Sequence, residues 1–456
     1  MTVSVEERQR NVRQLASDIL AKVDTRKAYA DILLDQALKA ATLNERDRAL
    51  LTELTYGTLR WRGNIDGQLS RYLRQPLART DPLIRNLLRV SVYQLRFLDK
   101  IPDHAAVNEA VELARNHSGG KSAGFVNAVL RNFLRGKDRV IGPAPKDESV
   151  AGLAVTYSHP EWLVKRWIDE FGVEAAKTLM RANNQRATLV LRVNCLKCTR
   201  EKLLDQFLEA GIKAEATQWS PQGISILSGP GVDTLPGFAE GYFQIQGEAS
   251  QLVAYLLSPL PGERILDACA APGGKSTHLG EFMKDEGELV AIDISARGIA
   301  KIRENGARLG LKSLRVLSAD ASAELADKVR GPYDRVLVDA PCSGLGTLRG
   351  HPEIKWHRDE NDIRRVSRLQ SKILSRVVGY LKPGGVLVYA TCTLSREENQ
   401  EIVESFLPHH TEFELEDAAR YLPEQATHMV RGKYFVALPH RDNTDGFFAA
   451  RMRKVC

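Results

Sequence analysis

Five short apolar segments, separated by stretches of helical pattern, constrain the fold of this chain more than any other feature. They are RILDACA (264–270), LVAIDIS (289–295), LRVLSAD (314–320), YDRVLVDAP (333–341) and GGVLVYATC (384–392). Strands that alternate with helices are joined by right-handed crossovers and form a parallel sheet. The sequence therefore predicts a Rossmann-like, doubly wound α/β domain over residues 239–456.

The first third of the chain has a different pattern. Apolar residues recur at helical spacing from Val12 to Val23, and similar runs follow, which predicts an all-α domain over residues 1–145. The stretch IGPAPKDESVAG (141–152) contains two prolines and two glycines without an apolar period. Such a stretch is typical of a linker between domains.

Residues 155–238 combine both kinds of element. A helical pattern over 160–182 precedes TLVLRVN (188–194), and the amphipathic REKLLDQFLEAG (200–211) precedes GISILSG (223–229). This order predicts a small α+β module between the two larger domains. Three domains also agree with the length of 456 residues, which exceeds what one hydrophobic core usually serves.

Positive charge is concentrated near the N-terminus. Residues 1–150 hold 25 Lys and Arg against 18 Asp and Glu, whereas the remaining residues are balanced. Arginines are dense between Arg60 and Arg96, and four aromatic residues lie among or beside them: Tyr56, Trp61, Tyr72 and Tyr93. These side chains either bind phosphates and stack on the bases of RNA, or form a core of aromatic residues under a solubilising face of arginines.

The chain carries neither a membrane span nor a secretory signal in its pattern. No apolar run approaches the roughly 20 residues of a membrane helix, and the start, MTVSVEERQRNVRQL, lacks an apolar signal core. Six cysteines are too few for a disulfide framework. We therefore expect a cytoplasmic protein whose cysteines are free thiols.

Acidic residues end four of the five predicted strands: Asp267, Asp293, Asp320 and Asp339. Ligands of open parallel sheets bind beyond the carboxyl ends of the strands, so these acids are expected to face one pocket. Asp293 is placed to accept hydrogen bonds from ribose hydroxyls, and Asp320 from an adenine amino group.

The turn after the first predicted strand favours a ligand without a pyrophosphate. ILDACAAPGGKSTHLGEF reads as strand, glycine-rich turn and helix, yet it matches neither of the two glycine-rich phosphate motifs. Gly273 and Gly274 let the backbone approach a ligand closely. A sulfonium cofactor, which carries positive charge, fits a pocket rich in carboxylates.

Two cysteines follow two strands that are expected to be neighbours, Cys342 in VLVDAPCSG and Cys392 in VLVYATCT. Neighbouring strands lie about 4.8 Å apart, so both thiols are expected in one pocket. Carbon 5 of cytosine becomes nucleophilic only after a nucleophile adds to carbon 6, and a thiolate suits this step. Asp339 is placed to hydrogen-bond the N3 and N4 edge of the base.

Local sequence distinguishes the two thiols. Ser395 and Glu398 have the spacing of a capping box at the start of a helix, and the N-terminus of that helix is expected to lower the pKa of Cys392. Cys195 and Cys198 form a C-x-x-C without a second pair, so we interpret them as structural and expect no metal.

Four motifs of the chain together resemble the Sun/Nol1/Nop2 family of RNA cytosine-C5 methyltransferases. They are DACAAPGGKS, AIDIS, DAPCSGLGTLRGHPEIKW and YATCTLSREENQEIV. The resemblance implies S-adenosylmethionine as cofactor. It also implies that Cys392 is the nucleophile and that Cys342 releases the covalent adduct, by removing the proton from carbon 5 or by eliminating the thiol. The implied cofactor contacts are Cys269 (through its backbone), Ala270, Ala271, Pro272, Gly273, Gly274, Lys275, Asp293, Asp320 and Asp339.

The N-terminal part resembles a second family. RDRALLTELTYGTLRWRGNID and the helices before it look like the NusB-type RNA-binding domain. Joined to this catalytic core, it resembles the bacterial members of the family that act on 16S ribosomal RNA. The resemblance implies an RNA partner, a monomer without an obligate protein partner, no membrane, and an RNA-recognition-like module around LVLRVNCLK.

Three alternatives remain open. A DNA cytosine methyltransferase uses the cysteine of the P-C motif as nucleophile, but the Glu-Asn-Val motif of such enzymes is not found in the sequence. A tRNA or large-subunit rRNA methyltransferase of the same family performs identical chemistry. A non-catalytic RNA-binding factor of the antitermination type is suggested by the N-terminal domain alone.

Overall fold

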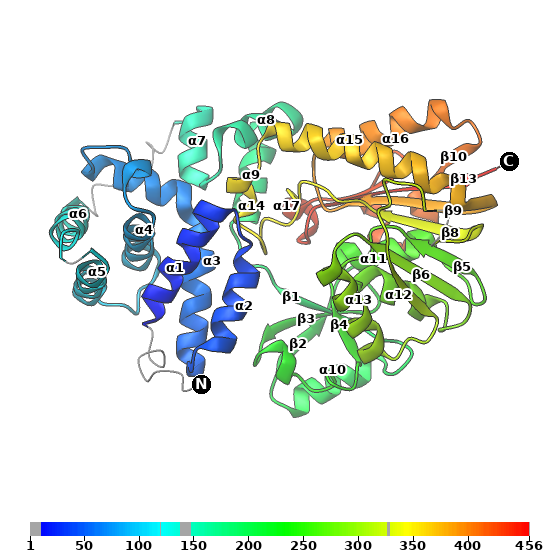
Figure 1. Cartoon of the computed structure of the whole chain (residues 1–456), viewed down its shortest axis with the longest axis horizontal. Helices are drawn as coiled ribbons and strands as arrows, with labels where there is room; N and C mark the ends of the chain where they lie inside the picture. The colour runs from blue at the N-terminus through cyan, green and yellow to red at the C-terminus, as the bar shows by residue number, and fades with distance from the viewer. Residues whose placement is uncertain (1–10, 119, 137–146, 326–328, 456) are drawn as a thin grey trace. The chain divides into compact units, whose positions relative to one another are not determined.

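The computed structural model describes residues 11–118, 120–136, 147–325 and 329–455 (Figure 1). The chain divides into two compact units, Met1–Gln185 with Leu348–His357, and Arg186–Thr347 with Arg358–Cys456. The first half of the predicted linker at 141–152, residues 141–146, lies outside the described residues. The predicted domain boundaries near 145 and 238 stay predictions.

The helical unit forms as the apolar periodicity predicts. Leu15, Ile19 and Val23 are buried on one face of its first helix, which packs against the third and fourth helices. The helices are α1 (Val12–Arg26), α2 (Ala30–Ala40), α3 (Glu45–Leu69), α4 (Pro82–Phe97), α5 (Asp103–Ser118), α6 (Ala123–Gly136), α7 (Val150–Tyr157), α8 (Glu161–Phe171), α9 (Val173–Asn183) and α14 (Ile354–His357). The expectation of a helical N-terminal domain is confirmed.

A short segment far along the chain belongs to this helical unit. Leu348–His357, which carries the sequence motif HPEIKW, groups with the helices and not with the sheet that precedes and follows it. Trp356 Nε1 donates to the carbonyl of Leu59 at 2.8 Å, and the buried Lys355 donates to the carbonyl of Arg60 at 2.9 Å. The segment is therefore hydrogen-bonded to the backbone of α3.

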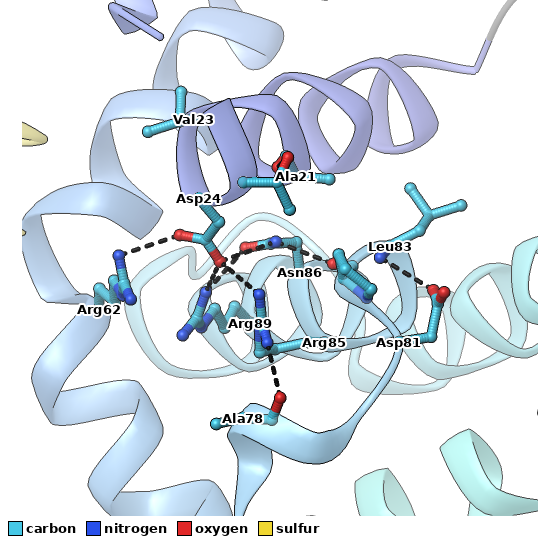
Figure 2. Close-up of polar contacts among 12 residues, drawn as sticks. Ala21, Val23, Asp24, Arg62, Ala78, Asp81, Leu83, Arg85, Asn86 and Arg89 are labelled. Atoms are coloured by element: carbon cyan, nitrogen blue, oxygen red, sulfur yellow. Dashed lines mark hydrogen bonds and ion pairs between the residues drawn. The ribbon is translucent and has the colours of Figure 1, made fainter. Parts of the chain in front are cut away.

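Four of the arginines between Arg60 and Arg96 are used inside the helical unit. Figure 2 shows Arg62, Arg85 and Arg89 converging on the carboxylate of Asp24, at 2.9, 3.3 and 2.5 Å. Burial alone would raise the pKa of Asp24, but the charges of Arg89 and Arg62 hold it below its usual value. The buried Arg60 donates to a backbone carbonyl of the Leu348–His357 segment.

The aromatic residues among these arginines also pack internally. Tyr93 is buried, Trp61 stacks on Phe97 with 5.1 Å between the ring centroids, and Tyr72 meets the edge of Phe133 at 6.1 Å. These rings are therefore part of the core or its border. Of the two interpretations of this region, the aromatic core is correct for these three residues, but the arginines of Figure 2 form buried ion pairs and not a solubilising face.

The second unit begins with a small antiparallel sheet of order β2-β3-β1-β4. Its strands are β1 (Leu189–Val193), β2 (Lys213–Ala216), β3 (Gly223–Ser228) and β4 (Phe243–Ile245), and helix α10 (Arg200–Glu209) covers one face. Leu191, Ile224 and Phe243 point from the strands to Phe207 of the helix in a common core. The predicted α+β module is confirmed, with both predicted strands in place.

The larger sheet has the order β11-β12-β13-β9-β8-β5-β6-β7, with β10 paired to β13. The five predicted strands are its parallel part: β5 (Arg264–Asp267), β6 (Glu288–Asp293), β7 (Leu314–Ser318), β8 (Tyr333–Asp339) and β9 (Leu381–Thr391). Four further strands are antiparallel: β10 (Phe413–Glu416), β11 (Val430–Arg431), β12 (Tyr434–Ala437) and β13 (Phe447–Lys454).

Helices cover both faces of this sheet (Figure 1). On one face lie α15 (Glu360–Val377) and α16 (Gln400–Phe406), and on the other lie α11 (Glu248–Leu257), α12 (Gly274–Phe282) and α13 (Ala296–Leu309). The remaining short helix, α17 (Pro439–Asp442), follows β12. Successive residues of a strand point to opposite faces of the sheet, so each face has its own hydrophobic core. In β6, Leu289 packs in one core and Val290 in the other. The doubly wound α/β prediction is confirmed.

Within the described part of the chain, no helix is both long and apolar enough to cross a membrane.

Candidate active site

The two cysteines singled out in the sequence meet beyond the ends of β8 and β9. The strands pair in parallel, with Asp339 opposite Ala390, so the loops that follow them start side by side. The sulfur atoms of Cys342 and Cys392 are 3.3 Å apart, and both residues are partly exposed. The expectation that the two strands are neighbours is thus confirmed.

A lysine and an aspartate lie at the same edge of the sheet. Lys275, in the first turn of α12, donates to Asp339 Oδ2 at 2.7 Å, where β8 ends. The Lys275 ammonium group also lies 5.0 Å from the ring centroid of Phe447 on β13. Its positive charge lowers the pKa of the nearby Cys392 thiol.

The loop between β5 and α12 is held by Asp293 at the end of β6. Asp293 Oδ2 accepts from Ala271 N at 2.9 Å, while Oδ1 accepts from Ser295 N at 2.8 Å. Gly273 caps α12 with φ of 99°, a left-handed conformation that favours glycine. A Cβ at this position would lie 3.1 Å from the Cα of Ile302.

The four strand-end acids do converge, but they have different environments. Asp267 is fully buried and accepts from Ser276 Oγ at 2.6 Å, and burial raises its pKa to about 7. Asp320 is exposed, and hydrogen bonds from Ser322 lower its pKa. Asp267 therefore fastens the start of α12, whereas Asp293 and Asp320 keep exposed surface toward solvent.

Cys269 lies among these carboxylates. Burial, followed by the charges of Asp267, Asp339, Asp293 and Asp320, raises the pKa of its thiol well above the usual value. The thiol is therefore neutral. This pocket of carboxylates suits a ligand that offers amino, hydroxyl and cationic groups, and it disfavours a pyrophosphate.

The two paired thiols differ in acidity. The hydrogen bond from Cys342, and to a smaller extent the charge of Lys275, lower the pKa of Cys392, although burial and the charge of Asp339 oppose them. The same hydrogen bond, together with burial and the charge of Glu398, raises the pKa of Cys342 well above its usual value. Cys392 is therefore the more acidic thiol of the pair.

The capping box predicted from Ser395 and Glu398 is wrong. Ser395 makes no side-chain cap, a 3₁₀ turn spans Arg396–Glu398, and α16 starts only at Gln400. Glu398 instead accepts from the backbone nitrogen of Ser343 at 2.7 Å. The two loops meet in space, so the carboxylate of Glu398 binds the backbone next to Cys342. The pKa of Cys392 is therefore lowered by the hydrogen bond from Cys342 and the charge of Lys275, and not by the predicted helix terminus.

The sequence interpretation missed the polar residues that surround the cysteine loops. Ser343, Gln370 and Thr393 are fully buried and hydrogen-bonded to Glu398, and Asn399 donates to the carbonyl of Thr393 at 3.0 Å. Ser343 and Thr393 directly follow the two cysteines, which was a signal in the sequence, whereas Gln370 and Asn399 gave none. The other C-x-x-C cysteines lie in the small module, where Cys198 packs in the core and Cys195 is exposed.

Comparison with known families assigns each part of the chain. A model described as 16S rRNA methyltransferase RsmB/F matches residues 254–453. A NusB family model matches residues 10–135, and a model of the ferredoxin-like domain of RsmF/B-like methyltransferases matches residues 159–233. Probable ribosomal RNA small subunit methyltransferase B of Bacillus subtilis (strain 168) is 40% identical over 97% of this chain and 99% of its own length.

The chain belongs to the ribosomal RNA small subunit methyltransferase B family. The resemblance inferred from its motifs is thereby confirmed. A further member of this family, ribosomal RNA small subunit methyltransferase B of Pseudomonas putida (strain ATCC 47054), is 36% identical over 98% of this chain and 99% of its own.

Solved structures agree with this family assignment. One covers 98% of this chain and 100% of its own, with a TM-score of 0.82 and 27% identity. NSun6 from Pyrococcus horikoshii, solved with SFG, covers 65% of this chain and 98% of its own, with a TM-score of 0.58 and 26% identity.

Proposed function

We propose that this chain methylates carbon 5 of a cytosine in 16S ribosomal RNA, with S-adenosylmethionine as methyl donor and a covalent bond between Cys392 and carbon 6 of the base. The observation that carries the proposal is the pair of thiols, 3.3 Å apart, beside the ion pair of Lys275 and Asp339. Family membership supports rRNA methylation, and the thiol pair supports cytosine as the base.

The residues around the loop after β5 fit the cofactor. Bound S-adenosylmethionine supplies an electrophilic methyl group on a sulfonium. Asp293 would bind the ribose hydroxyls, Asp320 would bind the adenine amino group, and the backbone from Cys269 to Lys275 would line the site. The family neighbour solved with SFG, an analogue of this cofactor, supports the assignment.

The residues at the ends of β8 and β9 fit the base. The Cys392 thiolate adds to carbon 6, and the electrons of the double bond move to carbon 5, which then takes the methyl group. Asp339 accepts hydrogen bonds from the N4 amino group and from protonated N3, while Lys275 holds its carboxylate in place at 2.7 Å. Methyl transfer converts the sulfonium donor into its neutral thioether, and loss of the carbon 5 proton re-forms the carbon 5–carbon 6 double bond and expels the Cys392 thiolate. Cys342 assists this release, either by taking that proton once its own proton has passed to solvent or by promoting elimination of the thiol.

The helical unit supplies the binding surface for RNA in this proposal. The arginines of Figure 2 are engaged internally, so the phosphate contacts fall to the exposed arginines of the unit. Within the described residues of α6 and of the segment between α3 and α4, these are Arg71, Arg74, Arg79, Arg131 and Arg135. The monomeric state and the cytoplasmic location stay predictions.

Mechanism-based trapping tests the proposal directly. RNA that contains 5-azacytosine is incubated with the protein and the cofactor, and the covalent adduct is mapped by mass spectrometry. We expect attachment at Cys392. Attachment at Cys342 would contradict the assignment and favour the order of roles found in DNA cytosine methyltransferases.

Variants of the two cysteines separate their roles. Cys392→Ala should abolish methyl transfer but keep cofactor binding, whereas Cys342→Ala should leave a persistent protein–RNA adduct on denaturing gels. Cys195→Ala is the matched control, because this exposed cysteine lies outside the pair. Turnover of Cys392→Ala close to that of the unaltered chain would rule out the nucleophile role.

The substrate is decided by bisulfite sequencing. The 16S rRNA of a deletion strain should lose one 5-methylcytosine that the intact gene restores. A change in tRNA or in large-subunit rRNA instead would select the alternative substrate of the same family. Failure to bind S-adenosylmethionine in calorimetry would favour a non-catalytic RNA-binding factor.

A further inference from the structure

Glu398 is a buried carboxylate without a counter-charge. Its side chain is fully buried, and within the described residues it forms no ion pair. Burying an ionised carboxylate costs several kcal/mol unless hydrogen bonds replace its water. Burial raises the pKa of Glu398, and hydrogen bonds from Ser343, Gln370 and Thr393 oppose this shift and favour the ionised form.

Its hydrogen bonds join the two cysteine loops. Ser343, the residue after Cys342, donates its backbone nitrogen at 2.7 Å and its hydroxyl at 2.5 Å. Thr393, the residue after Cys392, donates its hydroxyl at 3.3 Å, and the two hydroxyls are 2.8 Å apart. One carboxylate thus binds the immediate neighbours of both thiols.

Helix α15 closes the arrangement. Gln370 Nε2 donates to Glu398 Oε2 at 3.2 Å and to the carbonyl of Pro341, the residue before Cys342, at 2.9 Å. The backbone on both sides of Cys342 is therefore tied to Glu398, once directly and once through Gln370. The backbone carbonyl of Glu398 is also bound, by the hydroxyl of Tyr389 at 2.6 Å.

We propose that Glu398 is a positioning residue of the methyl-transfer site, whose buried carboxylate holds the Cys342 loop against the Cys392 loop so that the two thiols face one substrate base. This inference rests on the proposed roles of the two cysteines. Hydrogen bonds to a charged acceptor are roughly twice as strong as those between neutral groups. Both oxygens of Glu398 accept, whereas a glutamine has one acceptor oxygen, so a carboxylate fits this set of donors better.

The negative charge has a second effect at the same place. The hydrogen bond to Cys392 and burial are the main causes that raise the pKa of Cys342, and the charge of Glu398 adds to them. The charge of Glu398 thus acts in the direction that keeps Cys342 protonated.

The first test reports on the thiols without RNA or cofactor. A trivalent phenylarsenical binds two adjacent thiols with loss of one water, and a single thiol binds it far more weakly. We expect tight binding by the unaltered chain, loss of tight binding in Cys342→Ala, and binding at least about tenfold weaker in Glu398→Ala. Binding by Glu398→Ala as tight as that of the unaltered chain would overturn the proposal.

The second test measures turnover. A misplacement of about 1 Å costs roughly 100-fold in rate, so we expect a loss of that order in kcat for Glu398→Ala, with the KM for RNA and the affinity for cofactor within threefold. Glu398→Gln should recover much of the arsenical binding but only part of kcat. Its single amide oxygen can still accept from Ser343 N and Gln370, but the charge is lost and the Ser343 and Thr393 hydroxyls must reverse to accept from the amide nitrogen. Equal losses in kcat and in cofactor affinity would indicate general unfolding and refute a positioning role.

Glu416→Ala is the matched control. Glu416 pairs with Arg451 at 2.6 Å and with Arg453 at 2.8 Å, in the same domain but at the strand pair of β10 and β13. It should lower stability yet keep kcat and arsenical binding at a temperature where the variant is folded. If Cys392→Ala still methylates RNA, the proposed function fails, whereas the arsenical measurement still decides whether Glu398 holds the thiols together.

Discussion

The buried ion pair between Arg192 and Glu281 joins the small antiparallel sheet to helix α12. Arg192, on β1, is fully buried and donates to Glu281 Oε1 at 2.6 Å, to the carbonyl of Gly274 at 2.5 Å and to Thr277 Oγ1 at 3.1 Å. It also donates to the side chain of Gln246. Burial raises the pKa of Glu281 to about 7, although the charge of Arg192 opposes this shift.

Removing the arginine alone should be strongly destabilising. Arg192→Met keeps a long side chain but leaves Glu281 buried without its cation, and breaking a buried pair in this way typically costs about 3–5 kcal/mol. For a domain of this size each kcal/mol lowers Tm by roughly 2–4 °C, so the expected decrease is about 6–20 °C. The carbonyl of Gly274 loses a donor at the same time, which adds to the cost.

Scanning calorimetry measures this effect. The chain has two compact units, so the transition of the unit that contains Arg192 must be followed separately. In the variant the pKa of Glu281 rises further above its ordinary value. A protein loses stability as pH rises from the unfolded pKa of such a carboxyl up to its raised folded pKa. In the unaltered chain this loss ends at about pH 7, where Glu281 ionises, whereas in the variant it continues. The difference in free energy of unfolding between the two proteins should therefore grow above about pH 7.

The double variant Arg192→Met with Glu281→Met is the decisive control. Replacing both members of a buried ion pair by apolar side chains of similar size is often neutral or stabilising. We therefore expect the double variant to recover most of the lost stability. A loss below about 1 kcal/mol in the single variant, or a double variant as unstable as the single one, would refute the reasoning.

Three further perturbations follow from the same geometry. Asp24→Asn should destabilise the helical unit by about 3–5 kcal/mol in urea unfolding, because it leaves three arginines without their shared carboxylate. The control Asp35→Asn, at an exposed position, should change the stability little. The fold lowers the pKa of Asp24, so its stabilising contribution is present above its ordinary pKa of 3.8 and is lost only as pH falls through the folded value. Asp293→Ala should weaken cofactor binding by about 1.5–3 kcal/mol in calorimetry, and unchanged affinity would remove Asp293 from the pocket. Gly346→Ala should reduce turnover in steady-state kinetics, because its Cβ would lie 2.1 Å from the carbonyl oxygen of Gly446, and normal turnover would show that this loop can shift.

Local patterns predicted the parallel sheet because its strands are short, mainly apolar runs, and in the described residues a helix follows four of the five, β7 being the exception. The strands β10 to β13 were not predicted, since they are antiparallel and three of them, β10, β11 and β12, have only 4, 2 and 4 residues. Their partners are distant in sequence, as the register of Ala450 with Tyr389 shows. The position of Leu348–His357 in the helical unit is equally non-local, because it depends on hydrogen bonds to α3.

The arginines of the helical unit show the same limit. A run of arginines beside aromatic residues has one composition whether it binds phosphates or forms internal ion pairs, and only the position of Asp24 decides between them. That aspartate is on α1, whereas Arg62 lies on α3 and Arg85 and Arg89 lie on α4. Charge counts therefore predicted a basic unit correctly but overestimated how much of its charge is free for RNA.

The capping-box prediction at Glu398 failed because its carboxylate binds a residue that is distant in sequence. A serine and a glutamate three residues apart satisfy a capping box locally, and the sequence offers no competitor for the carboxylate within the same segment. The competitor is Ser343, 55 residues earlier, whose backbone nitrogen is buried beside it once β8 and β9 pair. A buried nitrogen left without an acceptor costs about 1–3 kcal/mol, whereas a helix end in water keeps its solvent, so the carboxylate binds Ser343. The pairing that brings the cysteines together is thus the same one that takes Glu398 away from its own helix.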